Sequence, residues 1–388
     1  MRVALCGFAL LAAAASAQDV LSQPAFEHFY NLEYDEAIAI FSADARNRPA
    51  EPGPLNHIAQ CLLYRAMYRA GALESGMFAG SNPFTSRPKV AMSPEDDQQF
   101  TGAIARAMEL ADARIKANPN DARALYSLGA SQGLRSNYSF LVKHAYRDTL
   151  RDASAARKLH HRVTELDASL VDARLVQGVY DYVVGSLPLT MRMLGFIAGF
   201  HGDRERGIQT LKTVAAEGKE NRYDAAVLLC ALLRREKRPR EAVPLLGELI
   251  QKLPRNFLMR FELAEMYTDL RDKPRALEAI GEIERLKHSN AVGYGRLAEE
   301  KIRFARGNLL FTFKDFDPAL EDLKAATANA TVLDKVTGAE AWLRLGQVYD
   351  LKGQRQPAIN AYQQVLRTLP ESEAGSLAKR YSASRYRL

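Results

Sequence analysis

The strongest constraint on the fold is a spaced set of aromatic, small and aliphatic residues near the C-terminal end of the chain. The set comprises Trp342, Leu345, Gly346, Tyr349, Ala358, Tyr362, Val365 and Pro370. Its three- and four-residue steps place an apolar stripe on each of two successive helices, and Pro370 ends the second. Such a hairpin cannot bury its own apolar face, so the pattern predicts a stack of helical hairpins.

Weaker copies of this pattern recur upstream at about the 34-residue period of the tetratricopeptide repeat, which the C-terminal set resembles. The copies run through Leu263, Ala264, Tyr267, Ala276 and Ile280, through Cys230, Leu233, Ala242, Leu246 and Pro254, and through Gly307, Leu310, Ala319 and Leu323. Divergent copies lie near Ala37 and Leu125, the latter with its second helix displaced to around Leu159. We therefore predict an all-α fold, an α-solenoid of stacked tetratricopeptide-like helical hairpins with a divergent N-terminal half.

Length and composition agree with this fold. The 388 residues are 47% apolar and 26% charged, with both signs mixed throughout, so the chain can bury a large core. We divide the chain into a divergent helical region over residues 18–220 and a regular repeat array over residues 221–388. A single continuous solenoid is the simplest account, and two lobes are the alternative.

The first residues have the pattern of a secretory signal peptide. Arg2 precedes an apolar run over residues 3–15, and small residues at Ala15 and Ala17 precede Gln18. The run is too short to span a bilayer. We predict that residues 1–17 are a bacterial-type signal peptide and that the protein is exported to the periplasm or cell envelope; an uncleaved N-terminal anchor is the alternative. Cleavage leaves Cys61 and Cys230, whose apolar surroundings favour buried thiols over a disulfide.

The basic balance of the chain does not by itself indicate a polyanionic partner. The formal net charge is +7, but basic and acidic residues alternate, and we predict no nucleic-acid binding. The densest basic cluster comprises Arg234, Arg235, Lys237, Arg238 and Arg240. It falls where two helices turn and is predicted to be a solvated loop, with docking on anionic phospholipid as the alternative.

Catalytic and metal-binding patterns are weak. Ser131 lies in a G-x-S-x-G match, but this motif acts on a sharp strand-to-helix turn and here it falls within a repeat helix and its following turn. His160 and His161 are adjacent and diverge by about 100° on a helix. We predict no catalytic residue, no metal and no cofactor. An enzyme would need a pocket that gathers His144, His160 or Ser131 with a carboxylate.

An irregular segment separates the two halves. Its recognisable positions are Ser186, Leu187, Pro188, Gly199, Phe200, Gly202, Asp203, Arg204, Gly207 and Leu211. Pro188 is predicted to begin a short apolar helix over residues 188–200, within an insertion over residues 186–207, and Asp203 to cap the next helix. The apolar helix is either a plug between hairpins or an exposed surface for a partner or lipid.

These ten positions resemble a run found between repeats in the tetratricopeptide-39 and inclusion-body-clearance proteins. Pro188 follows Leu187 one residue sooner than in that run. The resemblance implies an all-helical, non-catalytic repeat protein that acts by protein contact, in some members near membranes or lipid bodies and in aggregate clearance. The signal peptide departs from that intracellular family and suits a bacterial envelope protein.

The first helices of the repeats form the concave face on which such an array would bind a peptide. The residues predicted to line this groove are Val227, Arg234, Phe261, Glu265, Thr268, Phe304, Asn308, Phe311, Leu343, Gln347 and Asp350. We predict a non-catalytic scaffold or adaptor that binds a segment of another protein there. One alternative is a peripheral membrane or lipid-binding protein that uses the helix over residues 188–200. Another is that several groove residues pack against a neighbouring helix or against a C-terminal helix that fills the groove.

Overall fold

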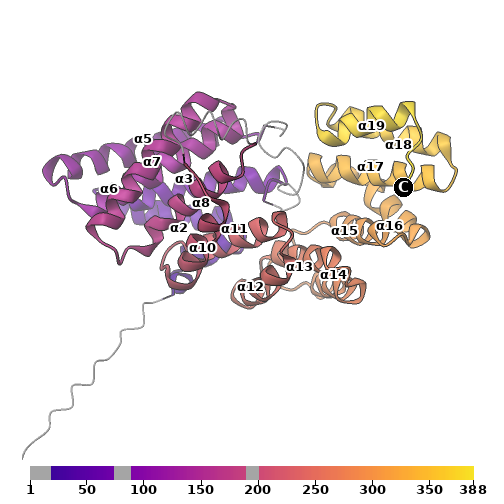
Figure 1. The fold of residues 1–388 in the computed structure, drawn as a ribbon, viewed down its shortest axis with the longest axis horizontal. Helices are drawn as coiled ribbons and strands as arrows, with labels where there is room; N and C mark the ends of the chain where they lie inside the picture. Colours follow the sequence, from indigo (N-terminus) through magenta and orange to yellow (C-terminus); the bar gives the residue numbers. More distant parts are fainter. Residues whose placement is uncertain (1–18, 74–88, 189–200) are drawn as a thin grey trace, which may run out of the picture.

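The computed structural model describes residues 19–73, 89–188 and 201–388. Every regular element formed by these residues is helical, which confirms the all-α prediction (Figure 1). The predicted signal peptide over residues 1–17 and nearly all of the predicted apolar helix over residues 188–200 lie outside the described residues.

The helices follow one another along a curved array (Figure 1). Those of the N-terminal half are α1 (Pro24–Tyr30), α2 (Tyr34–Asn47), α3 (Gly53–Arg69), α5 (Pro94–Ala117), α6 (Ala122–Tyr138), α7 (Tyr146–Leu166), α8 (Arg174–Gly185) and α10 (Arg204–Glu217). Those of the regular array are α11 (Arg222–Arg235), α12 (Pro239–Lys252), α13 (Phe257–Asp269), α14 (Lys273–His288), α15 (Glu299–Thr312), α16 (Phe316–Ala328), α17 (Lys335–Leu351), α18 (Arg355–Thr368) and α19 (Glu373–Ala383). Short helical turns are η1 (Val20–Ser22), η2 (Ser139–Lys143), η3 (Val171–Ala173) and η4 (Ala330–Val332).

The hairpin of α17 and α18 shows how the sequence pattern produces the fold. Asp334 caps α17 by accepting a hydrogen bond from the backbone N–H of Thr337 at 2.9 Å. In the middle of α17, Gly346 leaves room for the ring of Tyr362, which is fully buried and reaches across from α18. The hydroxyl of Tyr362 donates to Asp350 at 2.9 Å. The small residue therefore permits a close approach that one buried hydrogen bond then fixes.

Successive hairpins stack so that their first helices lie next to one another. In the C-terminal part, α13 contacts α15, and α15 contacts α17. Further back, Arg234 of α11 donates to Glu265 of α13 at 2.6 Å. The first helices α11, α13, α15 and α17 thus form one layer, which we call the inner face, and the second helices form the other.

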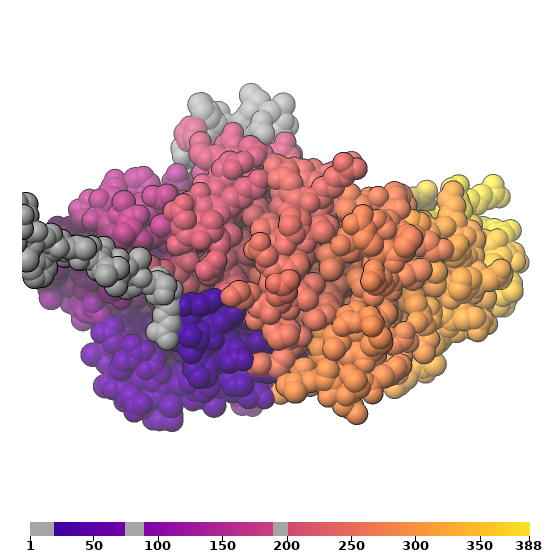
Figure 2. All heavy atoms as spheres, turned by 90° about the horizontal axis from the view of Figure 1, so that it is seen from below, coloured from indigo at the N-terminus to yellow at the C-terminus, as the bar shows by residue number. Residues whose placement is uncertain are grey.

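The N-terminal hairpin packs back onto the middle of the array. The Tyr30 hydroxyl donates to Asp224 at 2.6 Å, and Arg255 donates to Glu33 at 2.8 Å and to Glu27 at 2.8 Å. Figure 2 shows the N-terminal residues lying against those around residue 250 on this face of the molecule. One hydrophobic cluster accordingly runs from Val20 to Ala361. Cys61 and Cys230 are buried free thiols within it, as predicted.

Where the structure describes it, the irregular segment makes packing, capping and ion-pair contacts with the neighbouring helices. Gly207 lies so close to α8 that a Cβ would come within 2.7 Å of the backbone nitrogen of Tyr182. Asp203 caps α10 by accepting from the N–H of Arg206 at 2.7 Å, as predicted, and Leu211 is fully buried. Ser186, Leu187 and Pro188 follow the end of α8, Gly202 packs on α8, and Arg204 forms an ion pair with Glu236 at 3.4 Å. Gly199 and Phe200 lie outside the described residues.

Candidate functional site

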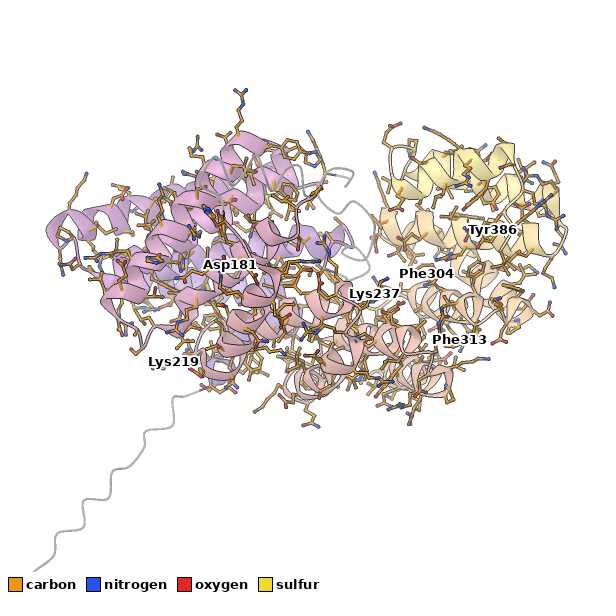
Figure 3. All side chains as sticks on the ribbon, viewed as in Figure 1. Asp181, Lys219, Lys237, Phe304, Phe313 and Tyr386 are labelled. Atoms are coloured by element: carbon orange, nitrogen blue, oxygen red, sulfur yellow. The ribbon has the colours of Figure 1, made fainter. Side chains whose placement is uncertain are left out.

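The structure places every predicted groove residue on the first helices α11, α13, α15 and α17. Those that are buried are Phe261, Thr268, Phe311, Leu343, Gln347 and Asp350. Those that are partly exposed are Val227, Arg234, Glu265, Phe304 and Asn308. Figure 3 marks Phe304 on α15 and Tyr386 in the C-terminal tail, both within the C-terminal repeats. Fewer of these residues are therefore available to a partner than the sequence predicted.

Arg234 ties α11 to α13 through acidic side chains. Its guanidinium donates to Glu265 at 2.6 Å and to Asp269 at 2.8 Å, and its side chain is only 10% exposed. Burial lowers the pKa of Arg234, but the nearby carboxylates offset this and leave its pKa above the ordinary value. The prediction of a solvated basic loop is wrong for Arg234, because these carboxylates make its burial favourable.

The rest of the basic turn is neutralised locally. Arg238 donates to Glu241 at 2.6 Å and to Glu205 at 2.7 Å, which joins the turn to α12 and α10. Lys237 takes a left-handed conformation at the turn, with φ of 57°, and Figure 3 shows where it lies. Because the charge of Arg238 is already paired, the turn offers less free positive charge to an anionic surface than its sequence suggests.

Arg344 on α17 is the most unusual charged side chain of the inner face. Its guanidinium donates to Asn308 Oδ1 at 2.7 Å and to Gln347 Oε1 at 2.9 Å, and it lies 4.7 Å from the ring centroid of Phe311. These direct partners are neutral, whereas the carboxylates of Glu340 and Glu265 act on Arg344 through the electrostatic field and favour its charged form. Burial lowers the pKa of Arg344 below its ordinary value. The inner face therefore holds an arginine whose hydrogen bonds go to neutral side chains and for which burial outweighs the effect of the nearby carboxylates.

Asp350, the penultimate residue of α17, is a second polar centre. Its carboxylate is fully buried and accepts hydrogen bonds from Arg355 at 2.9 Å, from the Tyr362 hydroxyl at 2.9 Å and from the backbone N–H of Tyr386 at 2.9 Å. The backbone carbonyl of Asp350 accepts from Arg385 Nε at 2.7 Å. The C-terminal tail, residues 384–388, is thus held against the inner face.

The residues considered for catalysis lie in different structural settings. The Ser131 hydroxyl bonds to Asn56 Oδ1 at 2.6 Å in the interior of the helical stack, and all of Gly129 to Gly133 lies within α6. His160 is 2% exposed and packs against Gly129, and burial lowers its pKa to about 4. His144 lies in a left-handed turn with φ of 54°. None of these contacts pairs a nucleophile with a base.

One group of side chains in the described residues has metal-ligating chemistry. Glu284, His288 and Glu299 bring ligand atoms within 4.8 Å of one another at the junction of α14 and α15. However, Glu284 accepts from Arg306 at 3.0 Å, and Glu299 lies 3.3 Å from Arg303. The arginines compete with a cation for these carboxylates, so the group is best described as an ion-pair network.

A family model described as tetratricopeptide repeat matches residues 339–368, which span α17 and α18. The C-terminal hairpin is a tetratricopeptide repeat. This agrees with the pattern that begins at Trp342, whereas the finer resemblance to the tetratricopeptide-39 proteins stays a prediction. A search of curated proteins finds no match to the chain.

Several solved structures are similar to this chain. The structure of yeast Tom70 aligns at 13% identity and a TM-score of 0.43, covering 94% of this chain and 87% of that one. Human IFIT1, solved as a dimer with m7Gppp-AAAA, aligns at 12% identity and a TM-score of 0.47, covering 93% and 83%. YrrB, described as a tetratricopeptide-repeat protein with an unusual peptide-binding site, aligns at 15% identity and a TM-score of 0.32, covering 70% and 99%.

Sequence reasoning missed Arg344 and the tail residues Arg385 and Tyr386. Arg344 lies three positions before Gln347, which was predicted, so helical spacing alone places both on one face. The tail carried no comparable signal, because nothing in its sequence shows where an extended segment folds back. The alternative of a membrane-contacting helix over residues 188–200 falls outside the described residues. None of the described helices is long and apolar enough to cross a membrane.

Proposed function

We propose that this protein is a non-catalytic interaction scaffold, or adaptor, of the cell envelope that binds a segment of another protein on the inner face of its repeat array. Repeat arrays use such extended concave surfaces for binding, and the C-terminal hairpin is a repeat of this kind. The partly exposed Phe304 and Asn308 supply an aromatic and a hydrogen-bonding contact there. YrrB, a similar structure by fold, is described as having a peptide-binding site.

Arg344 is the observation that carries the proposal. A partly buried guanidinium that is hydrogen-bonded only to neutral groups costs stability unless these groups compensate for its lost hydration. Asn308, Gln347 and the Phe311 ring compensate in part, but none of them is charged. A segment that brings a carboxylate or main-chain carbonyls to the inner face would complete this environment, and the completed pair would add to affinity.

Site-specific photo-cross-linking tests the proposal. A photoreactive phenylalanine derivative replaces Phe304 on the inner face or, as a control, Val292, which is 75% exposed on the connection between α14 and α15. Irradiation of cells that make the protein should yield a discrete adduct from position 304 and not from position 292. The adduct should weaken at least about tenfold with Arg344→Gln, and not with Arg285→Gln, whose side chain is 73% exposed. Equal adducts at both positions, or an adduct indifferent to Arg344, would contradict the proposal.

The envelope location is part of the proposal and has its own measurement. The pattern over residues 1–17 supports export with cleavage before Gln18. N-terminal sequencing of the protein recovered from separated periplasmic, membrane and cytoplasmic fractions should find chains that begin at Gln18 outside the cytoplasm. Recovery of an intact Met1 in the cytoplasmic fraction alone would refute the location without affecting the binding surface.

A further inference from the structure

We infer that the inner face at α15 and α17 recognises a segment in which an arginine is followed directly by an aromatic residue, and that Arg385 and Tyr386 occupy this site as an intramolecular ligand. The inference rests on the proposed function, because it names the class of partner for the same surface. It also makes the C-terminal tail a competitor of that partner.

The path of the tail is the first observation. After α19 ends at Ala383, the chain leaves the helix at Ser384 in an extended conformation, with φ of −132° and ψ of 133°. It then turns back onto α17, and Figure 1 marks the C-terminus beside α17 and not beyond α19. Arg355 holds the end of α19 in place by donating to the Ser382 carbonyl at 2.7 Å.

The arginine position is defined by the end of α17. Both Nε and Nη2 of Arg385 donate to the backbone carbonyl of Asp350, with Nε at 2.7 Å. The last carbonyls of a helix lack intrahelical partners and carry partial negative charge, so they favour a cation. The planar guanidinium directs two N–H groups at one acceptor, which a lysine ammonium cannot reproduce in the same geometry.

The next contacts of the tail are made by the backbone N–H and the ring of Tyr386. The Tyr386 N–H donates to the Asp350 carboxylate at 2.9 Å, a contact that any residue other than proline can make. The Tyr386 ring lies 6.2 Å from Phe311 and 5.0 Å from Tyr381, between centroids. Burial raises the pKa of Tyr386. Together with Arg344 over Phe311, these groups form a site for a flat ring.

The tail is held by few contacts, so a partner can replace it. Arg385 and Arg387 are exposed residues, and Leu388 is 68% exposed. The hydrogen bonds of Arg385 and Tyr386 go to Asp350, whereas Arg344 is bonded to Asn308 and Gln347 of the repeat helices. The tail therefore satisfies the site only in part. Its advantage is the tether, which supplies an effective concentration in the millimolar range.

A peptide-binding measurement tests the inference. The probe is a fluorescein-labelled peptide with the sequence of residues 382–388, Ser-Ala-Ser-Arg-Tyr-Arg-Leu, followed by fluorescence anisotropy. A chain shortened to end at Ser384 should bind it saturably, and the full chain should bind at least about tenfold more weakly because its own tail competes. Peptides with lysine in place of the first arginine, or alanine in place of the tyrosine, should bind the shortened chain at least about tenfold more weakly.

A second variant guards against an effect of the shortening itself. The full-length double variant Arg385→Ala with Tyr386→Ala keeps the chain length and should bind the peptide as the shortened chain does. If both variants keep the circular dichroism spectrum of the parent and neither binds the peptide, the inference is wrong. Equal binding by the parent and both variants would also overturn it, because the tail would then not occupy the site.

The two proposals fail in distinguishable ways. Peptide binding by the shortened chain, with no adduct from position 304, would leave the recognition site standing and remove the scaffold function. An adduct from position 304 that excess peptide does not reduce would preserve the scaffold function and overturn the arginine–aromatic recognition.

Discussion

Replacing Gly346 with alanine tests whether the close contact between α17 and α18 holds the last repeat together. A Cβ at this position would come within 2.7 Å of Cδ1 of Tyr362, which real Cβ atoms essentially never do. The Tyr362 ring is fully buried, and its hydroxyl is held by Asp350, so the ring has nowhere to move without breaking that bond. We therefore expect Gly346→Ala to destabilise the hairpin although alanine favours helix.

The magnitude follows from three effects. Alanine in place of glycine gains about 1 kcal/mol of helix propensity. Overpacking a rigid buried ring costs about 3 kcal/mol, at the upper end of the usual range. Displacing the Tyr362 hydroxyl from Asp350 costs about 1 kcal/mol more. The expected net loss is about 3 kcal/mol, which would unfold the last repeat well before the remainder of the array.

The chain provides its own local reporter for this experiment. Trp342 is its only tryptophan and lies in α17, one turn before Gly346. Urea unfolding followed by Trp342 fluorescence reports the last repeat, and far-ultraviolet circular dichroism reports the whole array. Because repeats couple mainly to their neighbours, the fluorescence midpoint should fall more than the circular dichroism midpoint.

Gly281 in α14 provides the matched control. A Cβ there would meet nothing within 4 Å, so Gly281→Ala should gain about 0.5–1 kcal/mol from helix propensity alone. Gly281→Ala should raise the unfolding midpoint of its own repeat. If Gly346→Ala likewise raises the fluorescence midpoint, the close contact is not rigid and the reasoning is refuted.

Three further predictions concern other parts of the structure. Burial raises the pKa of Asp224 from its ordinary value of 3.8 to about 6, so the stability that its protonated carboxyl contributes is fully present below pH 3.8 and is lost as pH rises through 6. The unfolding free energy of Asp224→Asn relative to the parent should therefore rise by up to about 3 kcal/mol between about pH 4 and pH 8, and a pH-independent difference would contradict this. Arg255→Ala should lower the free energy of unfolding by about 2 kcal/mol and speed proteolysis within α1 and α2. Arg106→Ala is the control, because the Arg106 side chain is 52% exposed, and it should change both measurements little. Asp203→Ala removes the cap of α10 and should cost about 1 kcal/mol in thermal or urea unfolding; no change would show that the cap is dispensable.

Much of the local structure was predictable, because it depends on near neighbours in the chain. The three- and four-residue steps around Gly346 predict the hairpin, and the Asp203 cap follows from its place before an amphipathic run. The groove was predicted from repeat positions, and its residues do lie on the first helices. Their exposure was not predicted, since Gln347 and Asp350 are 3% and 0% exposed through contacts that the repeat pattern does not contain.

By itself, then, the sequence determined that the chain forms stacked helical hairpins and which helix faces are apolar, because helical periodicity and small residues act over a few positions. Only the tertiary structure decided which distant parts meet. Tyr30 bonds to Asp224 across 194 positions, and Arg385 reaches the end of α17 across 35. Such contacts depend on the small rotation between successive repeats, which accumulates along the array into its curvature. No local sequence pattern encodes this accumulated rotation. The packing of the N-terminal hairpin and the course of the tail therefore became known only from the tertiary structure.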